Sequence, residues 1–277
     1  MAVGFVGSLH IWKLFGYQDE DRNNDGTIKR RFVSTLTSCI LGAVLVVVLA
    51  EPASTSAEAP SHLSFTVPEL LGISVSIEAC RACAQTVLLT AICFLGPVVQ
   101  HLLDVREGYS LLISGNDEPL IDLRDQVVAP LTEEFFFRGC LVRLLDAAEL
   151  PFALVLIGSP VLFSLAHTHH YAEHVKRQSS KTGALAQVAF QVLYTSLFGA
   201  YATYVLLRTG STIAAIAVHM FCNRQGFPDM SVLASDDHRL ARFRLVLRAL
   251  YVSGVVLFGF LLNPLTEGFR PIFNCMF

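Results

Sequence analysis

The chain has 277 residues, of which 53% are hydrophobic and 16% are charged, and its 20 basic and 23 acidic residues give a net charge of -3. Soluble domains carry about 25% charged residues, and a mean hydropathy of +0.54 is too positive for a chain surrounded by water. The composition therefore indicates an integral membrane protein. It excludes a cytosolic enzyme, a secreted disulfide scaffold, a disordered chain and an ordinary nucleic-acid-binding protein.

Seven apolar segments follow one another along the chain, and a helix needs about 20 apolar residues to cross the hydrocarbon core of a membrane. Five of the segments are nearly free of charge, and Gly96 with Pro97 is expected to bend the second. The third and sixth also carry charged or polar side chains. We predict an all-α fold, a polytopic transmembrane helical bundle of about seven spans, at residues 32–50, 82–103, 126–145, 151–166, 184–207, 211–227 and 245–262.

Basic residues predict the orientation of these segments, because Lys and Arg accumulate in short cytoplasmic loops. Residues 29–31 are Lys-Arg-Arg and precede the first full segment, whereas loop 51–62 contains no Lys or Arg. If all seven segments cross, the basic residues of 176–181 and 239–244 also fall on the cytoplasmic side. We expect one membrane domain over 1–277, with its motif-bearing core at about 82–227.

Residues 1–31 are expected to be the remnant of a first transmembrane helix followed by a cytoplasmic loop. The seven cysteines are odd in number, and Cys80 with Cys83 forms a single C-x-x-C without a second pair. This pattern supports neither a zinc ribbon nor a disulfide framework. We expect these thiols to pack as small hydrophobic side chains.

The third segment contains two adjacent carboxylates and an arginine at membrane depth, where each ionisable group costs about 2.5 to 3.5 kcal/mol to insert. Glu134 and Arg138 are four residues apart, so they share one helix face and can form an ion pair. Glu133 is rotated about 100° from Glu134 and has no such partner in its own helix. We interpret Glu133 as a free carboxylate and the other two as its support. The alternative is that both glutamates are structural partners of Arg138 and of loop amides.

Two further clusters contain histidine. His167 follows Phe163 by one helical turn at the cytoplasmic end of the fourth segment. His219 and Asn223 are four residues apart in the sixth segment, so their polar groups project from one helix face. Together they could donate hydrogen bonds to one oxygen atom.

The predicted topology places Glu133, His167 and His219 in the cytoplasmic half of the membrane. A carboxylate, a histidine that shares its proton and a His/Asn pair are the groups that addition of water to an amide requires. The sequence has no H-E-x-x-H, G-x-S-x-G or G-x-G-D motif. The absence of these motifs leaves a glutamate-dependent hydrolase or a zinc hydrolase. We favour the glutamate-dependent hydrolase, because Asn223 suits an oxyanion better than a metal ion.

Two alternatives stay open from these residues alone. The first is a zinc hydrolase that uses Glu133, His167 and His219 as ligands, since three such ligands can leave an open position on the metal. The second is a transporter or scaffold in which the same groups form a proton relay or a helix-pairing network.

Three short motifs occur in order along the chain, and they carry all of these residues: E-E-x-x-x-R at 133–138, F-x-x-x-H at 163–167 and H-x-x-x-N at 219–223. With their flanks, they resemble the type II CAAX prenyl endopeptidases, the Ras-converting enzymes, which belong to a wider group of CAAX proteases and bacteriocin-processing enzymes. The likeness covers most of the chain and includes residues 27–32, 94–97 and 195–201.

The resemblance implies an endopeptidase that removes the last three residues from a prenylated C-terminal C-a-a-X sequence. It implies a multi-pass protein of the endoplasmic reticulum membrane with its active site toward the cytosol. Its partners would be farnesylated or geranylgeranylated CAAX proteins, such as Ras-like GTPases, and membrane lipid, with no nucleic acid. Members of the family begin with a complete transmembrane helix, whereas this chain is expected to start inside that helix.

The resemblance also implies a role for each motif residue. Glu133 and His167 would activate the attacking water, and His219 with Asn223 would stabilise the oxyanion of the transition state. No metal or other cofactor is expected. Supporting roles fall to the remaining charged residues of the first motif, Glu134 and Arg138.

Overall fold

The computed structural model describes residues 1–17, 21–54, 66–108, 118–166, 181–234 and 239–269, and within these ranges all regular structure is helical. The α-helices are α1 (Ala2–Ser8), α2 (Asp25–Ser54), α3 (Val67–Leu70), α4 (Ile77–Cys93), α5 (Leu95–Arg106), α6 (Pro119–Leu123), α7 (Ala129–Glu134), α8 (Arg143–Ala147), α9 (Phe152–Ala166), α11 (Lys181–Thr209), α12 (Thr212–Gln225) and α13 (Arg244–Leu261). Shorter helical segments are η1 (Ile11–Phe15), η2 (Arg124–Val128), η3 (Phe135–Val142), η5 (Met230–Leu233), η6 (Ala241–Phe243) and η7 (Pro264–Thr266).

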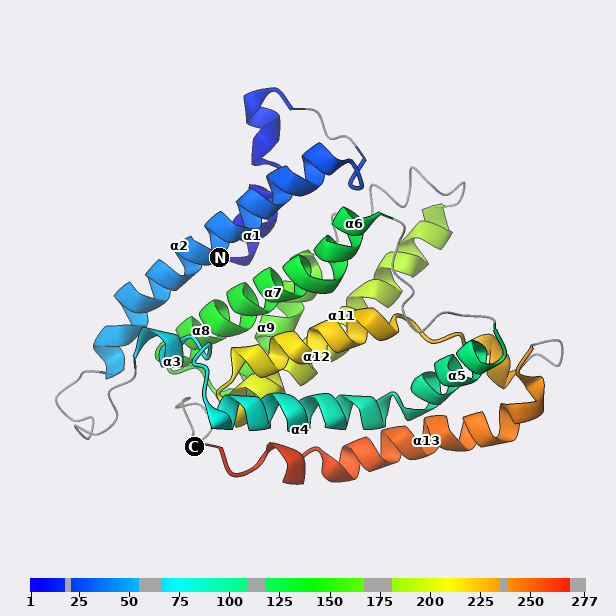
Figure 1. Ribbon diagram of the computed structural model, residues 1–277. Coiled ribbons are helices and arrows are strands. Elements are labelled where there is room, and N and C mark those ends of the chain that lie inside the picture. The colour runs from blue at the N-terminus through cyan, green and yellow to red at the C-terminus, as the bar shows by residue number, and fades with distance from the viewer. Residues whose placement is uncertain (18–20, 55–65, 109–117, 167–180, 235–238, 270–277) are drawn as a thin grey trace.

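The long helices run side by side between two common ends of the molecule (Figure 1). Helix α11 packs against α9 and α12, and α13 packs along α4 and α5. The first residues of α2 lie at the same end as the first residues of α11 and α13, whereas the ends of α8 and α11 lie at the opposite one (Figure 1). Each apolar segment predicted from the sequence thus corresponds to a helix or to a run of helices.

Fewer of these helices qualify as membrane spans than the sequence predicts. Within the described ranges, α2, α11 and α13 are long and apolar enough to cross a membrane, and α4 with α5 adds a fourth span if the bent pair is counted as one. The all-α prediction is confirmed, and a multi-pass membrane protein is supported. The count of seven crossings, the orientation and the assignment of residues 1–31 stay predictions.

The predicted bend in the second segment is confirmed. Helices α4 and α5 meet at an angle of 76°, and the break falls at Phe94, just before Gly96 and Pro97. Proline has no N–H to donate to the preceding turn, so the α4 hydrogen-bond pattern cannot continue through this point.

Residues 119–147 form one continuous helical run, made of α6, η2, α7, η3 and α8, which carries the first motif. Two stretches of this run are π-helical, namely η2 and η3. The first π-helical stretch precedes Pro130, and the N–H of Ala129 bonds to the carbonyl of Arg124 rather than to that of Asp125. Pro130 cannot donate to Asp125 either, so the Asp125 carbonyl has no donor within the helix.

Local signals set the ends of the helices around the site. Ser211 caps α12 because its side chain accepts a hydrogen bond from the N–H of Ala214 at 3.1 Å. Helix α12 ends at Gln225, and the capping residue Gly226 has a φ of 64° and a ψ of -165°, which suit a residue without a Cβ. These caps give α12 a defined start and end, and with them a defined position for His219 and Asn223.

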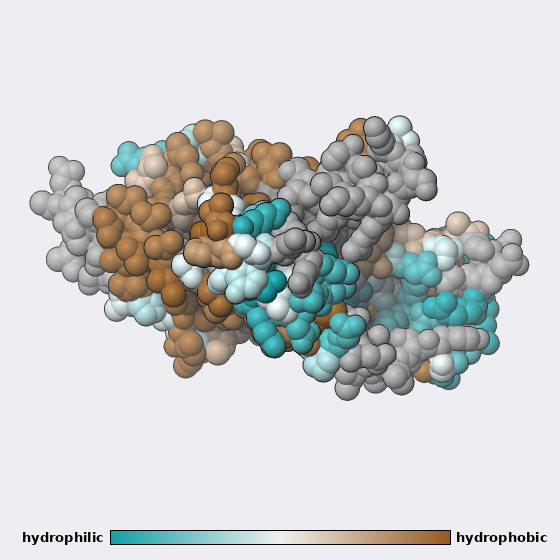
Figure 2. Space-filling model, turned by 90° about the horizontal axis from the view of Figure 1, so that it is seen from above, coloured by the Kyte–Doolittle hydropathy of each residue, from teal (hydrophilic) through white to brown (hydrophobic). Residues whose placement is uncertain are grey.

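Aromatic side chains form the core next to the first motif. Phe136 and Phe137 pack against Phe5 of α1, Cys39 of α2 and Phe163 of α9. The opposite side of α2 is exposed and apolar along most of its length, at Val33, Leu36, Ile40, Leu41, Val44, Leu45, Val48 and Leu49. When the whole molecule is seen from above, hydrophobic side chains cover the left part of the visible surface, and hydrophilic ones gather from the centre to the right (Figure 2). A large exposed apolar surface of this kind indicates contact with lipid.

Candidate active site

Glu134 and Arg138 form the predicted ion pair inside the helix bundle. Arg138 Nη1 donates to Glu134 Oε1 at 3.1 Å, and both side chains are fully buried. Arg138 Nη2 donates to the carbonyl oxygen of Gly199 on α11 at 3.1 Å, and the guanidinium lies 4.7 Å from the centre of the Phe163 ring. The arginine therefore joins three helices, and its charge is offset within the bundle.

Gly199 is part of this site, although sequence reasoning did not assign it a role. A Cβ atom at this position would lie 2.9 Å from Arg138 Nη2 and 3.0 Å from Pro160 Cβ. Glycine thus lets α11 approach α9 closely enough for the backbone carbonyl to reach the arginine. A glycine within an apolar span is a general signal of such close packing, but it does not identify the partner.

His219 contacts Glu134 and not Asn223. Its Nδ1 atom lies 2.8 Å from Glu134 Oε1, and its ring lies 4.7 Å from that of Phe198, centre to centre. His219 is buried. Because the Glu134 carboxylate accepts the hydrogen bond from Nδ1 of His219, the other ring nitrogen, Nε2, is the one available to a substrate. The sequence separation of 85 residues between His219 and Glu134 explains why helical spacing did not predict this contact.

The side-chain amide of Asn223 is held by the long helical run. Its Nδ2 atom donates to the Asp125 carbonyl oxygen at 2.8 Å, the carbonyl that the π-helical turn before Pro130 leaves without a donor in the helix. An Asn amide carries two N–H groups, so one of them remains for a ligand. Pro130 signals that a carbonyl nearby lacks its helical donor, but in a regular α-helix that carbonyl belongs to Gln126. The π-helical register is what frees the Asp125 carbonyl instead.

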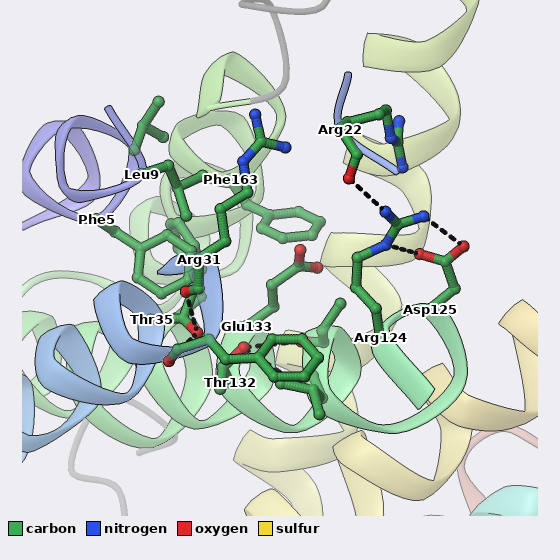
Figure 3. A pocket seen from close by; sticks show the side chains of 15 residues that line it. Phe5, Leu9, Arg22, Arg31, Thr35, Arg124, Asp125, Thr132, Glu133 and Phe163 are labelled. Carbon is green, nitrogen blue, oxygen red and sulfur yellow. Dashed lines mark hydrogen bonds and ion pairs between the residues drawn. The ribbon is translucent and has the colours of Figure 1, made fainter. Parts of the chain in front are cut away.

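Glu133, His219 and Asn223 line one cavity of about 510 Å³, which we call the bundle cavity. Glu133 also lines a second cavity of about 150 Å³, which we call the N-terminal cavity because α1 and the start of α2 form part of its wall. Figure 3 shows the N-terminal cavity, with the Glu133 carboxylate pointing into the space near Phe163. Within the described part of the chain, this carboxylate forms no hydrogen bond or ion pair.

The geometry therefore distinguishes the two adjacent glutamates in the way their helical positions suggested. Glu134 is buried and holds two cationic or polar partners, whereas Glu133 is half-buried on the wall of both cavities. His167 lies outside the described residues, so the predicted pairing of Glu133 with His167 stays a prediction. The catalytic roles of Glu133, His219 and Asn223 are likewise predictions at this point.

The zinc alternative depends on the same residues. Among the described residues, no group of three or more His, Cys, Asp and Glu side chains is arranged to hold a metal ion. His167, the third ligand of that hypothesis, is not among them.

Comparison with known proteins identifies relatives along most of the chain. Residues 118–224 match the family described as type II CAAX prenyl endopeptidase Rce1-like. The chain is 36% identical to CAAX prenyl protease 2 of Homo sapiens, over 96% of this chain and 79% of the relative. It is 31% identical to that of Caenorhabditis elegans, over 95% and 93%, and 30% identical to that of Saccharomyces cerevisiae, over 84% and 79%. No solved structure gives a significant match.

Proposed function

This chain belongs to the type II CAAX prenyl endopeptidases as a multi-pass endopeptidase of the CAAX prenyl protease 2 family, and from this premise we propose that it removes the C-terminal a-a-X tripeptide from prenylated CAAX proteins. Farnesylated or geranylgeranylated proteins such as Ras-like GTPases are its proposed substrates. The observation that carries the proposal is the convergence of Glu133, His219 and Asn223 on one cavity.

In the proposed reaction, Glu133 and His167 take a proton from water while its oxygen attacks the carbonyl carbon of the prenylated cysteine. The carbonyl becomes a tetrahedral oxyanion, which His219 and Asn223 stabilise with hydrogen bonds. The C–N bond then breaks, and the leaving nitrogen takes up a proton from the Glu133 and His167 pair. The products are the free tripeptide and a protein that ends in prenylcysteine.

The contacts of His219 determine which of its ring nitrogens can donate a hydrogen bond to the oxyanion. Nδ1 faces Glu134, so His219 donates through Nε2 and is doubly protonated when it stabilises the oxyanion. The Glu134 carboxylate offsets this positive charge, and Arg138 offsets the carboxylate in turn. Glu134 and Arg138 are thus positioning residues, and they do not touch the substrate in this proposal.

The location of the cavity suits a lipidated substrate. A prenyl chain prefers hydrocarbon, whereas the peptide that it anchors is polar and enters from the cytosol. We place the protein in the endoplasmic reticulum membrane with the cavity toward the cytosol. The basic residues near the start of α2 and of α13 support this orientation. Protease protection of tagged termini in microsomes tests it, and lumenal exposure of the start of α2 would contradict it.

The test of function uses the purified protein in detergent, without a membrane gradient, and a farnesylated C-a-a-X peptide. We expect tripeptide release by the wild type and a loss of at least about 100-fold in kcat for Glu133→Gln. Glu78→Gln, which changes an exposed carboxylate at the start of α4, is the matched control and should keep full activity. Normal turnover by folded Glu133→Gln would overturn the proposed mechanism.

A further measurement separates the zinc hydrolase from the glutamate mechanism. Stoichiometric zinc, with activity that is lost on chelation and restored by zinc, would favour the zinc hydrolase over the glutamate mechanism. Membership of an endopeptidase family argues against a transporter or scaffold. The single-domain boundaries of 1–277 remain part of this proposal, as does the motif core at about 82–227.

A further inference from the structure

Arg22 borders both cavities that meet at Glu133. It lies between η1 and α2 and lines the bundle cavity as well as the N-terminal cavity. Glu133 and Asp125 also line both of them. A group bound at Arg22 therefore lies against cavities that the Glu133 carboxylate also lines, and both residues are drawn on the wall of the N-terminal cavity in Figure 3.

The guanidinium of Arg22 has no hydrogen-bond or ion-pair partner within the described residues. Its neighbour Arg124 differs, because Nε and Nη2 of Arg124 bind the two carboxylate oxygens of Asp125 at 2.7 and 3.0 Å. Asp125 and Arg124 thus neutralise each other, and no carboxylate of the described residues pairs with Arg22, which is half-buried on the cavity wall. A planar guanidinium is suited to bidentate binding of a carboxylate.

Arg124 also fixes the position of Arg22 relative to the candidate catalytic residues. Its Nη1 atom donates to the backbone carbonyl of Arg22 at 2.9 Å and to Asn23 Oδ1 at 3.1 Å. Arg124 belongs to the same helical run as Glu133. The backbone at Arg22 is therefore attached to the helix of the active site, which sets the point from which its side chain extends.

The substrate of the proposed reaction carries one anionic group that this site fits. The α-carboxylate at the end of the substrate chain lies three residues beyond the cleaved bond. For an extended peptide this is within about 10 Å of that bond. In the cavity this carboxylate meets the carboxylate of Glu133, so it needs a cation. We propose that Arg22 binds the C-terminal carboxylate of the substrate and so selects peptides that end three residues after the cleaved bond, an inference that rests on the proposed function.

The experiment compares two farnesylated peptides of one sequence, one with a free C-terminal carboxylate and one with a C-terminal carboxamide. We expect the wild type to prefer the free acid by about 10- to 100-fold in kcat/KM, the range for a charge-assisted hydrogen bond. Arg22→Gln should slow cleavage of the acid and leave that of the amide nearly unchanged. Arg22→Lys, which keeps the charge, should retain part of the preference. Arg106→Gln is the matched control, since Arg106 is exposed at the end of α5 and lines neither cavity.

The outcomes separate this inference from the proposed function. Equal cleavage of acid and amide by the wild type would overturn the role of Arg22 while tripeptide release still supported the function. Equal slowing of both peptides by Arg22→Gln would do the same, because it would indicate a structural role. A wild type that releases no tripeptide from the free acid would overturn the function and this inference together.

Discussion

Nδ1 of His219 lies 2.8 Å from Oε1 of Glu134, the same oxygen that accepts a hydrogen bond from Arg138. One buried carboxylate therefore connects the first and third motifs. This contact changes the interpretation of Glu134, because the helical spacing alone assigned it only to Arg138. In the structure it also orients the imidazole ring on the wall of the bundle cavity.

The first prediction concerns the charge of Glu134. Glu134→Gln keeps the size of the side chain but removes the charge that faces His219. We expect kcat to fall by about 10- to 100-fold, the range for loss of a charge-assisted hydrogen bond, with little change in KM because Glu134 does not touch substrate. Steady-state kinetics on a farnesylated peptide measures this split. An unchanged kcat, or a loss confined to KM, would contradict a positioning role.

The second prediction concerns the buried ion pair. Arg138→Met leaves Glu134 without its arginine, and removal of one partner of a buried pair costs about 3 to 5 kcal/mol. Unfolding in detergent measures the loss. The double variant Glu134→Gln with Arg138→Met should be more stable than Arg138→Met alone, since it removes the uncompensated charge. Strictly additive effects would indicate that the two side chains do not interact.

The third prediction concerns the close approach at Gly199. Gly199→Ala places a methyl group against Arg138 Nη2 and Pro160, so we expect a loss of about 1 to 3 kcal/mol in the free energy of unfolding. Gly158→Ala on α9 is the matched control, because nothing lies within 4 Å of a Cβ there. The comparison of melting temperatures tests the idea. Equal behaviour of the two variants would show that Gly199 is not sterically required.

The fourth prediction concerns Pro130. Pro130→Ala restores a backbone N–H that can bond within the helix, so it competes for the carbonyls that the π-helical turn now releases. Asn223 would then lose its contact with Asp125 in part of the population. We expect kcat to fall by about two- to tenfold, as for the loss of one neutral hydrogen bond, while the protein stays folded. Pro119→Ala, at the start of α6, is the control and should leave kcat unchanged.

The sequence by itself determined the helical class, the membrane environment and the pairing of Glu134 with Arg138. These follow from composition and from contacts within one or two helical turns, where spacing alone sets which side chains share a face. The bend before Pro97 was predictable for the same local reason, since proline ends the hydrogen-bond pattern of α4. The family motifs also pointed to the residues that line the bundle cavity.

Only the tertiary structure decided which groups meet across the helices. Three contacts join segments that are 61 to 98 residues apart: His219 with Glu134, the Gly199 carbonyl with Arg138, and Asn223 with the Asp125 carbonyl. Helical periodicity says which face of a helix is polar but not which neighbour that face meets, because this depends on how the bundle packs. The packing turned a set of costly intramembrane charges into one compensated network, and it left Glu133 on the cavity wall outside that network.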